Sequence, residues 1–143
     1  MKANINYYAQ AVNTAITDTE EIGESLNPHF EVLKEALDQN KVTELSVEQL
    51  TTIKEKFAEG TEKYRGINTI LVGLKAPVKV LGVHKQLLKS YSEFIRGCQE
   101  MTDSIDAEKQ AVDTEVFTSS EAVQDVSSDS MMKTIQRITK ILF

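Results

Sequence analysis

Mostly apolar side chains recur along residues 4–39 at alternating steps of three and four positions. The recurring positions are Ile5, Tyr8, Val12, Ala15, Thr19, Ile22, Leu26, His29, Leu33 and Ala36. This spacing is typical of a helix that faces a core or a coiled-coil partner. Pro28 interrupts the pattern, because proline removes a backbone donor and crowds the preceding turn. The apolar stripe keeps its phase across Pro28, so the pattern predicts one kinked helix and not two separate helices.

A second helix is predicted over residues 47–75, and its start is the best-marked boundary in the chain. Ser46 and Gln49 have the spacing of a capping box. Leu45 and Leu50 flank the cap with the spacing of a hydrophobic staple. A polar linker near residue 40 therefore separates the first two helices.

Pro77 ends the second helix, because the residue before a proline avoids the helical region. Gly60 lies on the apolar stripe of that helix, which predicts a close approach to another backbone. Residues 78–82 fit either an extended connector or the first turn of the next helix. A third helix is predicted over residues 83–116, and a last helix over residues 131–142.

The serine-rich stretches 118–120 and 127–130 predict loop or cap material before the last helix, although apolar residues from Ala122 onward also fit an earlier start. The fold class predicted is all-α. We expect an elongated up-down antiparallel bundle of three long helices plus a shorter C-terminal helix, in a single domain over residues 1–143. The same stripes fit pairing between chains as a coiled coil, so a dimer is an alternative.

Composition agrees with a few long helices. Among 143 residues, six glycines and two prolines supply too few turns for a sandwich or barrel of short strands. The 16 basic and 22 acidic residues give a net charge of −6. By segment, the net charge is −5 over residues 1–40, +1 over 41–75, +2 over 76–100 and −4 over 101–143. No segment is basic enough to neutralise a run of phosphates, so we expect no nucleic-acid partner.

Features that indicate a cellular location are few. The single cysteine, Cys98, cannot form an intrachain disulfide, which suits a reducing compartment. The first residues contain no apolar stretch of signal-peptide length, and the apolar run 70–74 is too short to span a bilayer. We expect a cytoplasmic protein, with leaderless secretion as an alternative.

The sequence lacks the residue patterns that usually bind metals and cofactors. Neither His29 nor His84 follows a glutamate three positions earlier, as a di-iron bundle requires. With Cys98 they make only three zinc-type ligands, and these are not clustered in the sequence. The acidic run 20–24 is typical of a solvated helix face. No phosphate-binding, dinucleotide or nucleophile-elbow motif occurs, so we expect no metal site and no cofactor.

Nucleophilic catalysis is not predicted either. Cys98 and His84 fall two heptads apart on one predicted helix, or about 21 Å, which is beyond hydrogen-bond reach. We expect Cys98 to be a small buried apolar residue. We expect His84 to be a packed or capping side chain. No catalytic residue is assigned.

The tyrosines divide into two groups. Tyr8, Tyr64 and Tyr91 lie on apolar stripes and are expected to pack in the core with their hydroxyls at its rim. Tyr7 falls off the stripe and is expected to be exposed.

The last thirteen residues, 131–143, contain no acidic side chain. On a helical wheel, Lys133, Arg137 and Lys140 fall within about 60° of one another. A basic amphipathic helix of this kind lies on an anionic membrane or enters a partner's groove. The alternative is that its apolar side packs on the bundle and leaves the cations in water. The candidate face comprises Met131, Met132, Lys133, Ile135, Arg137, Ile138, Lys140, Leu142 and Phe143.

These observations predict a non-enzymatic helical bundle that acts through protein–protein contacts, as a scaffold, adaptor or binding module. Its partner is expected to be another protein or a second copy of the chain. One alternative is a peripheral membrane protein that uses residues 131–143. Another is a small-ligand carrier or enzyme with a site inside the bundle, near Tyr64, Tyr91, His84 or Cys98.

Overall fold

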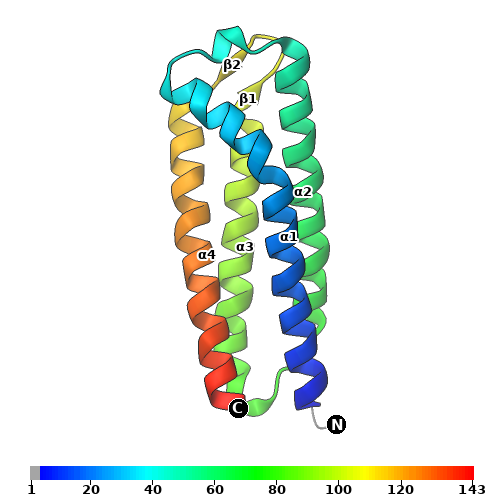
Figure 1. The fold of residues 1–143 in the computed structure, drawn as a ribbon. Coiled ribbons are helices and arrows are strands. Elements are labelled where there is room, and N and C mark those ends of the chain that lie inside the picture. The colour runs from blue at the N-terminus through cyan, green and yellow to red at the C-terminus, as the bar shows by residue number, and fades with distance from the viewer. Residues whose placement is uncertain (1–3) are drawn as a thin grey trace.

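Four helices pack side by side in the computed structural model, which describes residues 4–143 (Figure 1). They are α1 (Ile5–Asp38), α2 (Val47–Gly73), α3 (Leu81–Asp103) and α4 (Thr114–Leu142). Each helix runs antiparallel to the next along the chain, so the all-α, antiparallel arrangement is confirmed. The expectation of three long helices and a shorter fourth is wrong, because α4 has 29 residues and α3, with 23, is the shortest.

The helix predicted over residues 83–116 is in fact two helices separated by a hairpin. The strands of the hairpin are β1 (Ile105–Asp106) and β2 (Ala111–Val112), which pair antiparallel. Ile105 and Val112 continue the helical spacing in the sequence, yet they are directly opposite each other in this pair. The helical spacing of apolar residues therefore continues across the hairpin, so this spacing does not predict the break between α3 and α4.

Local hydrogen bonds explain the break after α3. The Ser104 hydroxyl donates to the backbone oxygen of Met101 at 2.6 Å, at the end of the last helical turn. The Asp106 carboxylate accepts a bond from the backbone amide of Lys109 at 3.2 Å. Such bonds offer the backbone an alternative to the helix. Gln110, with a φ of 50°, takes the left-handed conformation that completes the turn.

Helix α4 begins at Thr114, well before the predicted start at residue 131. The Asp113 carboxylate accepts a hydrogen bond from the backbone amide of Val116 at 3.1 Å. This is the bond that an aspartate makes at a helix N-terminus. The segment predicted as a short last helix is therefore the final part of a much longer one.

The prediction of loop or cap material for the two serine-rich stretches is wrong, because both lie inside α4. Ser120 and Ser127 are buried, and their hydroxyls donate to carbonyls of the preceding turn. The hydroxyls of Ser90 in α3 and Ser130 in α4 are 2.7 Å apart. A Cβ added at Gly97 of α3 would lie 3.1 Å from the backbone oxygen of Ser120. Small side chains thus let α3 and α4 pack closely along their length.

Helix α1 runs unbroken through Pro28, and Figure 1 shows that this helix bends along its length. The single kinked helix is confirmed. Beyond the bend, α1 reaches α4, where the ring of Phe30 stacks on that of Phe117 with centroids 6.0 Å apart. The Lys34 ammonium lies 2.9 Å from a Glu121 carboxylate oxygen in the same region. The bend therefore carries the end of α1 from α2 toward α4.

The start of α2 agrees with the prediction. The Ser46 hydroxyl accepts from the Gln49 amide at 3.0 Å, and the Gln49 side chain accepts from the Ser46 amide at 2.8 Å. Two 3₁₀ turns complete the connections: η1 (Val42–Glu44) precedes α2, and η2 (Val78–Val80) leads directly into α3. The segment after Pro77 is thus the start of the next helical element and not an extended connector.

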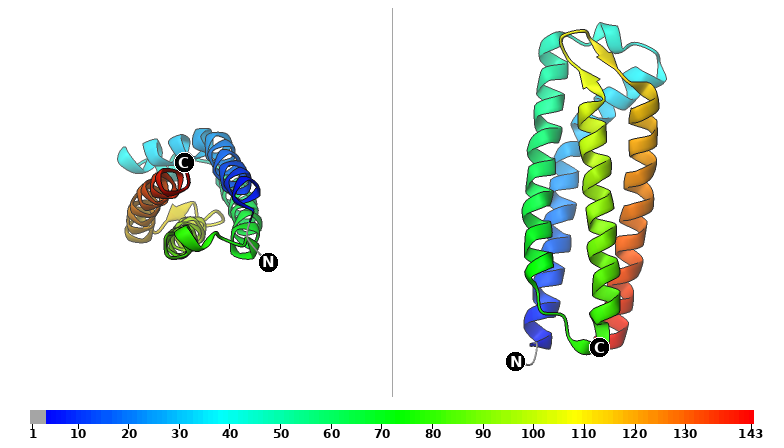
Figure 2. Two further views of the ribbon diagram at one scale, coloured as in Figure 1. Left: turned by 90° about the horizontal axis from the view of Figure 1, so that it is seen from below. Right: turned by 180° about the vertical axis from the view of Figure 1, so that it is seen from behind.

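The four helices surround one interior, with α3 between α2 and α4 (Figure 2). Buried residues form two clusters. The larger contains Tyr8, Val12, Ala15, Tyr64, Ile67, Leu71, Val80, Val83, Leu87, Tyr91, Ile95, Met131 and Ile138. The smaller, toward the hairpin, contains Leu33, Leu50, Ile53, Phe57, Met101, Ile105 and Phe117. The predicted burial of Tyr8, Tyr64 and Tyr91 is confirmed.

Candidate functional site

Folding separates the charged residues into two halves of the bundle. The half that holds the two ends of the chain contains residues 4–17, 63–92 and 130–143 (Figure 1). These residues include nine Lys or Arg and no Asp or Glu, and we call them the basic half. The acidic half contains residues 18–62 and 93–129, with 22 Asp or Glu and six Lys or Arg.

Side-chain contacts place the charge boundary at one level of the bundle. The hydroxyls of Thr19 in α1 and Tyr91 in α3 are 2.8 Å apart. The rings of Tyr64 in α2 and Phe94 in α3 meet edge to face with centroids 5.0 Å apart. Ser130 of α4 bonds to α3 at the same level. Each of these residues lies within one helical turn of the boundary between the basic half and the acidic half on its own helix.

Most cations of the basic half are free of ion pairs within the described residues. Lys133 pairs with Asp129 at 3.0 Å and Arg65 with Glu62 at 3.7 Å, both across the charge boundary. The other seven make no salt bridge within residues 4–143: Lys63, Lys75, Lys79, Lys85, Lys89, Arg137 and Lys140. Their charges add to a positive potential over this end of the molecule.

The tip of the basic half also exposes large apolar side chains. Val78 is 90% exposed, Phe143 75% and Tyr7 65%, so the predicted exposure of Tyr7 is confirmed. The start of α1, the α2–α3 connection and the end of α4 all lie at this end (Figure 1). This end of the molecule therefore presents several exposed apolar side chains together with lysines. The basic tip is defined here by Tyr7, Lys75, Val78, Lys79, Lys140 and Phe143.

The candidate face predicted over residues 131–143 is divided between the interior and the surface. Met131 and Ile138 are buried, and Ile135 and Leu142 pack partly buried against the same core cluster. The remaining five side chains of the face are exposed: Met132, Lys133, Arg137, Lys140 and Phe143. The face thus offers a partner its cations and two apolar side chains.

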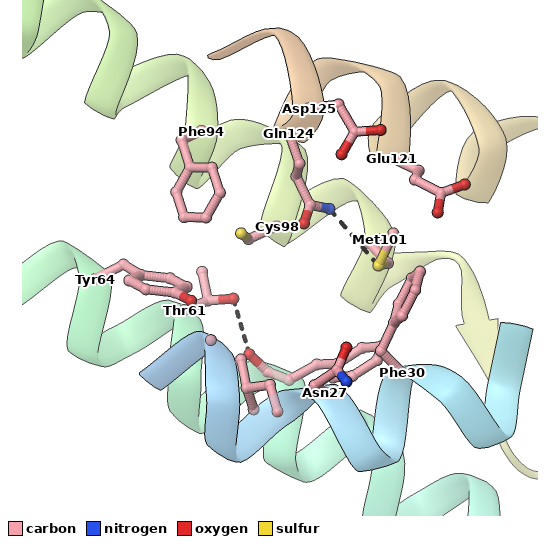
Figure 3. Close-up of a pocket in the computed structure, with 13 residues that line it drawn as sticks. Asn27, Phe30, Thr61, Tyr64, Phe94, Cys98, Met101, Glu121, Gln124 and Asp125 are labelled. Atoms are coloured by element: carbon pink, nitrogen blue, oxygen red, sulfur yellow. Dashed lines mark hydrogen bonds between the residues drawn. The ribbon is translucent and has the colours of Figure 1, made fainter. Parts of the chain in front are cut away.

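A cavity of about 260 Å³ lies between the four helices, just on the acidic side of the charge boundary (Figure 3). Its aromatic walls are Phe30 of α1, Phe57 and Tyr64 of α2, and Phe94 of α3. Helix α4 contributes the polar side chains Glu121, Gln124 and Asp125. None of these three is a predicted site residue, because all three precede residue 131, the main predicted start of the last helix. The Asp113 cap was the signal that places them on a helix.

The four residues named for an internal site do not all line one cavity. Tyr64 and Cys98 line the cavity, whereas Tyr91 and His84 do not. His84 is 4% exposed and hydrogen-bonded inside the basic half, so its predicted role as a packed side chain is confirmed. Cys98 is partly buried. Burial raises the pKa of its thiol to about 12. The thiol is therefore protonated at neutral pH and is a poor nucleophile.

Within residues 4–143, no group of three or more His, Cys, Asp or Glu side chains is arranged to hold a metal ion. No helix in this part of the chain is long and apolar enough to cross a membrane. Comparisons with known proteins found no matching family model, no matching curated protein and no matching solved structure. The separation of charge and the cavity are the two features from which a function is inferred.

Proposed function

We propose that this protein is a non-enzymatic binding module whose basic tip docks on an anionic membrane surface. The observation that supports this proposal is the separation of charge, with nine Lys or Arg and no Asp or Glu in the basic half. Each Lys or Arg held near an anionic leaflet contributes about 1 kcal/mol to binding. Val78, Phe143 and Tyr7 add apolar surface at the same end, where side chains of this kind enter the headgroup region.

The proposed docking is end-on. Met131 and Ile138 are buried in the core, so α4 does not offer a continuous apolar flank to a bilayer. The acidic half, with its 22 carboxylates, is repelled by the lipids that attract the basic half. Both effects favour the orientation in which the basic tip meets the membrane and the hairpin points into solution.

Vesicle sedimentation tests this proposal. We expect the protein to bind phosphatidylcholine vesicles that contain phosphatidylglycerol and not vesicles of phosphatidylcholine alone. Binding should fall as salt is added, because the screening length shrinks to about 3 Å at 1 M salt. The triple variant K75E/K79E/K140E should bind more than about a hundredfold more weakly, since three contacts of about 1 kcal/mol each are lost and become repulsive.

A matched control distinguishes the effect of charge at the basic tip from the effect of the protein's net charge. The variant K41E/K56E/K109E makes the same change in net charge, but all three positions lie in the acidic half. It should bind anionic vesicles nearly as well as the unaltered protein. An equal loss in both triple variants would contradict docking at the tip. Binding to double-stranded DNA without binding to vesicles would replace the membrane with a nucleic acid as the anionic partner.

We propose protein–protein contact through the acidic half as a second function. The supporting observation is that this half carries 22 acidic and six basic residues, with the apolar side chains of Val32 and Val47 more than 40% exposed among them. Such a surface fits a basic protein surface, and the basic tip of a second copy has that chemistry. The protein would then act as an adaptor or would associate end to end.

Light scattering at a series of concentrations tests contact between copies. At low salt the mass should rise with concentration, and at high salt it should return to that of a monomer. The K75E/K79E/K140E variant should stay monomeric, because it removes the complementary charges. A monomer at every concentration and at low salt would overturn contact between copies.

A further inference from the structure

The cavity exists because small residues and the bend of α1 leave space between the helices. A Cβ added at Gly23 of α1 would lie 3.7 Å from the Tyr64 hydroxyl oxygen, so glycine keeps this wall open. Leu26 fills the space over Gly60, where a Cβ would lie 2.6 Å from the Leu26 Cδ1 atom. The close approach predicted at Gly60 is therefore real, but its neighbour is a side chain and not a backbone.

Aromatic rings make up much of the cavity wall. Figure 3 shows Tyr64, Phe94 and Phe30 at three sides of the space, with the Met101 sulfur between α3 and the ring of Phe30. The π-faces of such rings attract a cation that lies within about 6 Å of them, most strongly where water is excluded. The wall is thus suited to an apolar or weakly hydrated cationic group.

The Tyr64 hydroxyl is one of the polar groups of this wall. Tyr64 is 3% exposed as a residue, and its hydroxyl oxygen lies at the cavity beside Gly23. Burial raises the pKa of Tyr64, so the group stays a neutral hydroxyl that can donate and accept. A ligand in the cavity can therefore donate a hydrogen bond to this hydroxyl or accept one from it. The amide of Gln124, in contrast, already donates to the Gly97 carbonyl oxygen at 3.3 Å.

The charged side chains around the cavity are carboxylates. Glu121 and Asp125 line it from α4, and no Lys or Arg does. Glu121 is paired with Lys34 at 2.9 Å, whereas Asp125 forms no salt bridge within residues 4–143. The surrounding acidic half strengthens the same negative potential. An anionic ligand would be repelled, and a sugar-like ligand would find too few free hydrogen-bonding groups.

We propose that this cavity binds a small organic cation, an amine or quaternary ammonium group carried on an aromatic or aliphatic body. The cationic group lies against the aromatic rings and Asp125. The body of the ligand fills the space between Phe57 and Phe94, and a polar substituent reaches the Tyr64 hydroxyl. This ligand site is separate from the basic tip and does not depend on membrane docking.

Titration calorimetry with benzyltrimethylammonium tests the ligand class. This compound should bind the full chain at least about tenfold more tightly than its uncharged isostere neopentylbenzene, because only the cation gains from the rings and the carboxylate. In a methyl-detected NMR spectrum, the Met101 signal should shift during the titration, since Met101 lines the cavity. Equal affinity for the two compounds would overturn the proposal.

Two matched pairs of variants locate the site. Gly23→Leu places a side chain inside the cavity and should abolish binding, whereas Gly66→Leu, at a glycine with open space around it, should leave binding unchanged. Asp125→Asn should weaken binding about tenfold, and Asp129→Asn, one turn further along α4, should not. Thermal unfolding shows whether each variant is folded. Undiminished binding by folded Gly23→Leu protein would place the ligand elsewhere and overturn the proposal.

Discussion

The Tyr8 hydroxyl lies 2.8 Å from Nδ1 of His84, which joins α1 to α3 near the basic tip. The Nε2 atom of the same ring lies 3.1 Å from the backbone oxygen of Leu71 in α2. A carbonyl oxygen only accepts, so Nε2 carries the ring proton and Nδ1 accepts from the tyrosine. One neutral imidazole therefore connects three helices. Burial lowers the pKa of His84, which keeps the ring in this neutral form.

We expect the free energy of unfolding to fall as the pH is lowered from about 7.5 to about 5.5. In the unfolded chain, His84 takes up a proton near its ordinary pKa of 6.5, whereas the folded protein resists protonation because its pKa is lower. The unfolded state then binds more protons than the folded state, and stability rises with pH across this range. The contribution is fully present above the unfolded pKa and is lost as the pH falls below it. Urea unfolding at a series of pH values measures the effect.

Variants of the two histidines test whether the His84 imidazole causes this dependence of the unfolding free energy on pH. His84→Gln should flatten the dependence of unfolding free energy on pH, even though the variant is less stable overall. His29→Gln removes the other histidine of the chain and should leave the slope in place. An unchanged slope in His84→Gln would show that a different group takes up the proton.

Leu71→Ala should lower the free energy of unfolding by about 2–5 kcal/mol, because it removes a fully buried side chain and leaves a cavity. Leu71 is 0% exposed in the larger core cluster. The adjacent Val72 is 59% exposed, so Val72→Ala should change stability by less than about 0.5 kcal/mol. Denaturant unfolding of the two variants makes the comparison. Equal effects would mean that the apolar stripe of α2 does not face the core.

Apolar periodicity predicts the interior of this bundle well, because burial repeats with the helical turn. Leu33, Leu50 and Leu71 are all on predicted stripes, and all three are fully buried. Periodicity fails at the hairpin, where Ile105 and Val112 stay in phase although the chain reverses between them. No glycine or proline marks this turn, which rests on side-chain hydrogen bonds such as that of Asp106.

The charge halves and the cavity depend on information that a linear pattern does not contain. Residues 63–92 and 130–143 are far apart in the chain and meet only because the helices alternate in direction. A net charge counted over a consecutive segment, such as residues 41–75, combines residues of the basic and acidic halves and so hides their separation. The cavity needs Glu121 and Asp125 on a helix, and that follows only once α4 is known to begin at Thr114.

Gly97→Ala should destabilise the protein by about 1–2 kcal/mol, since it overpacks the seam between α3 and α4. A Cβ there would lie 2.9 Å from Cγ of Gln124 and 3.1 Å from the backbone oxygen of Ser120. These contacts outweigh the gain in helix propensity of about 1 kcal/mol that alanine brings. Gly66→Ala has open space and should raise the unfolding midpoint. A higher midpoint for both variants would mean that the seam opens at little cost.

Cys98 should react slowly with iodoacetamide in the folded protein and rapidly in urea. Burial raises the pKa of its thiol to about 12, against an ordinary value of 9.0. The thiolate fraction at neutral pH is then lower by about a thousandfold, and only the thiolate attacks. A cysteine placed at Val126, which is 71% exposed, in a Cys98→Ser background supplies the fast reference rate. Because Cys98 lines the cavity, benzyltrimethylammonium should slow its alkylation further and leave the reference cysteine unaffected. A folded-state rate close to that of the reference would show that the cavity wall opens to solvent far more often than its packing implies.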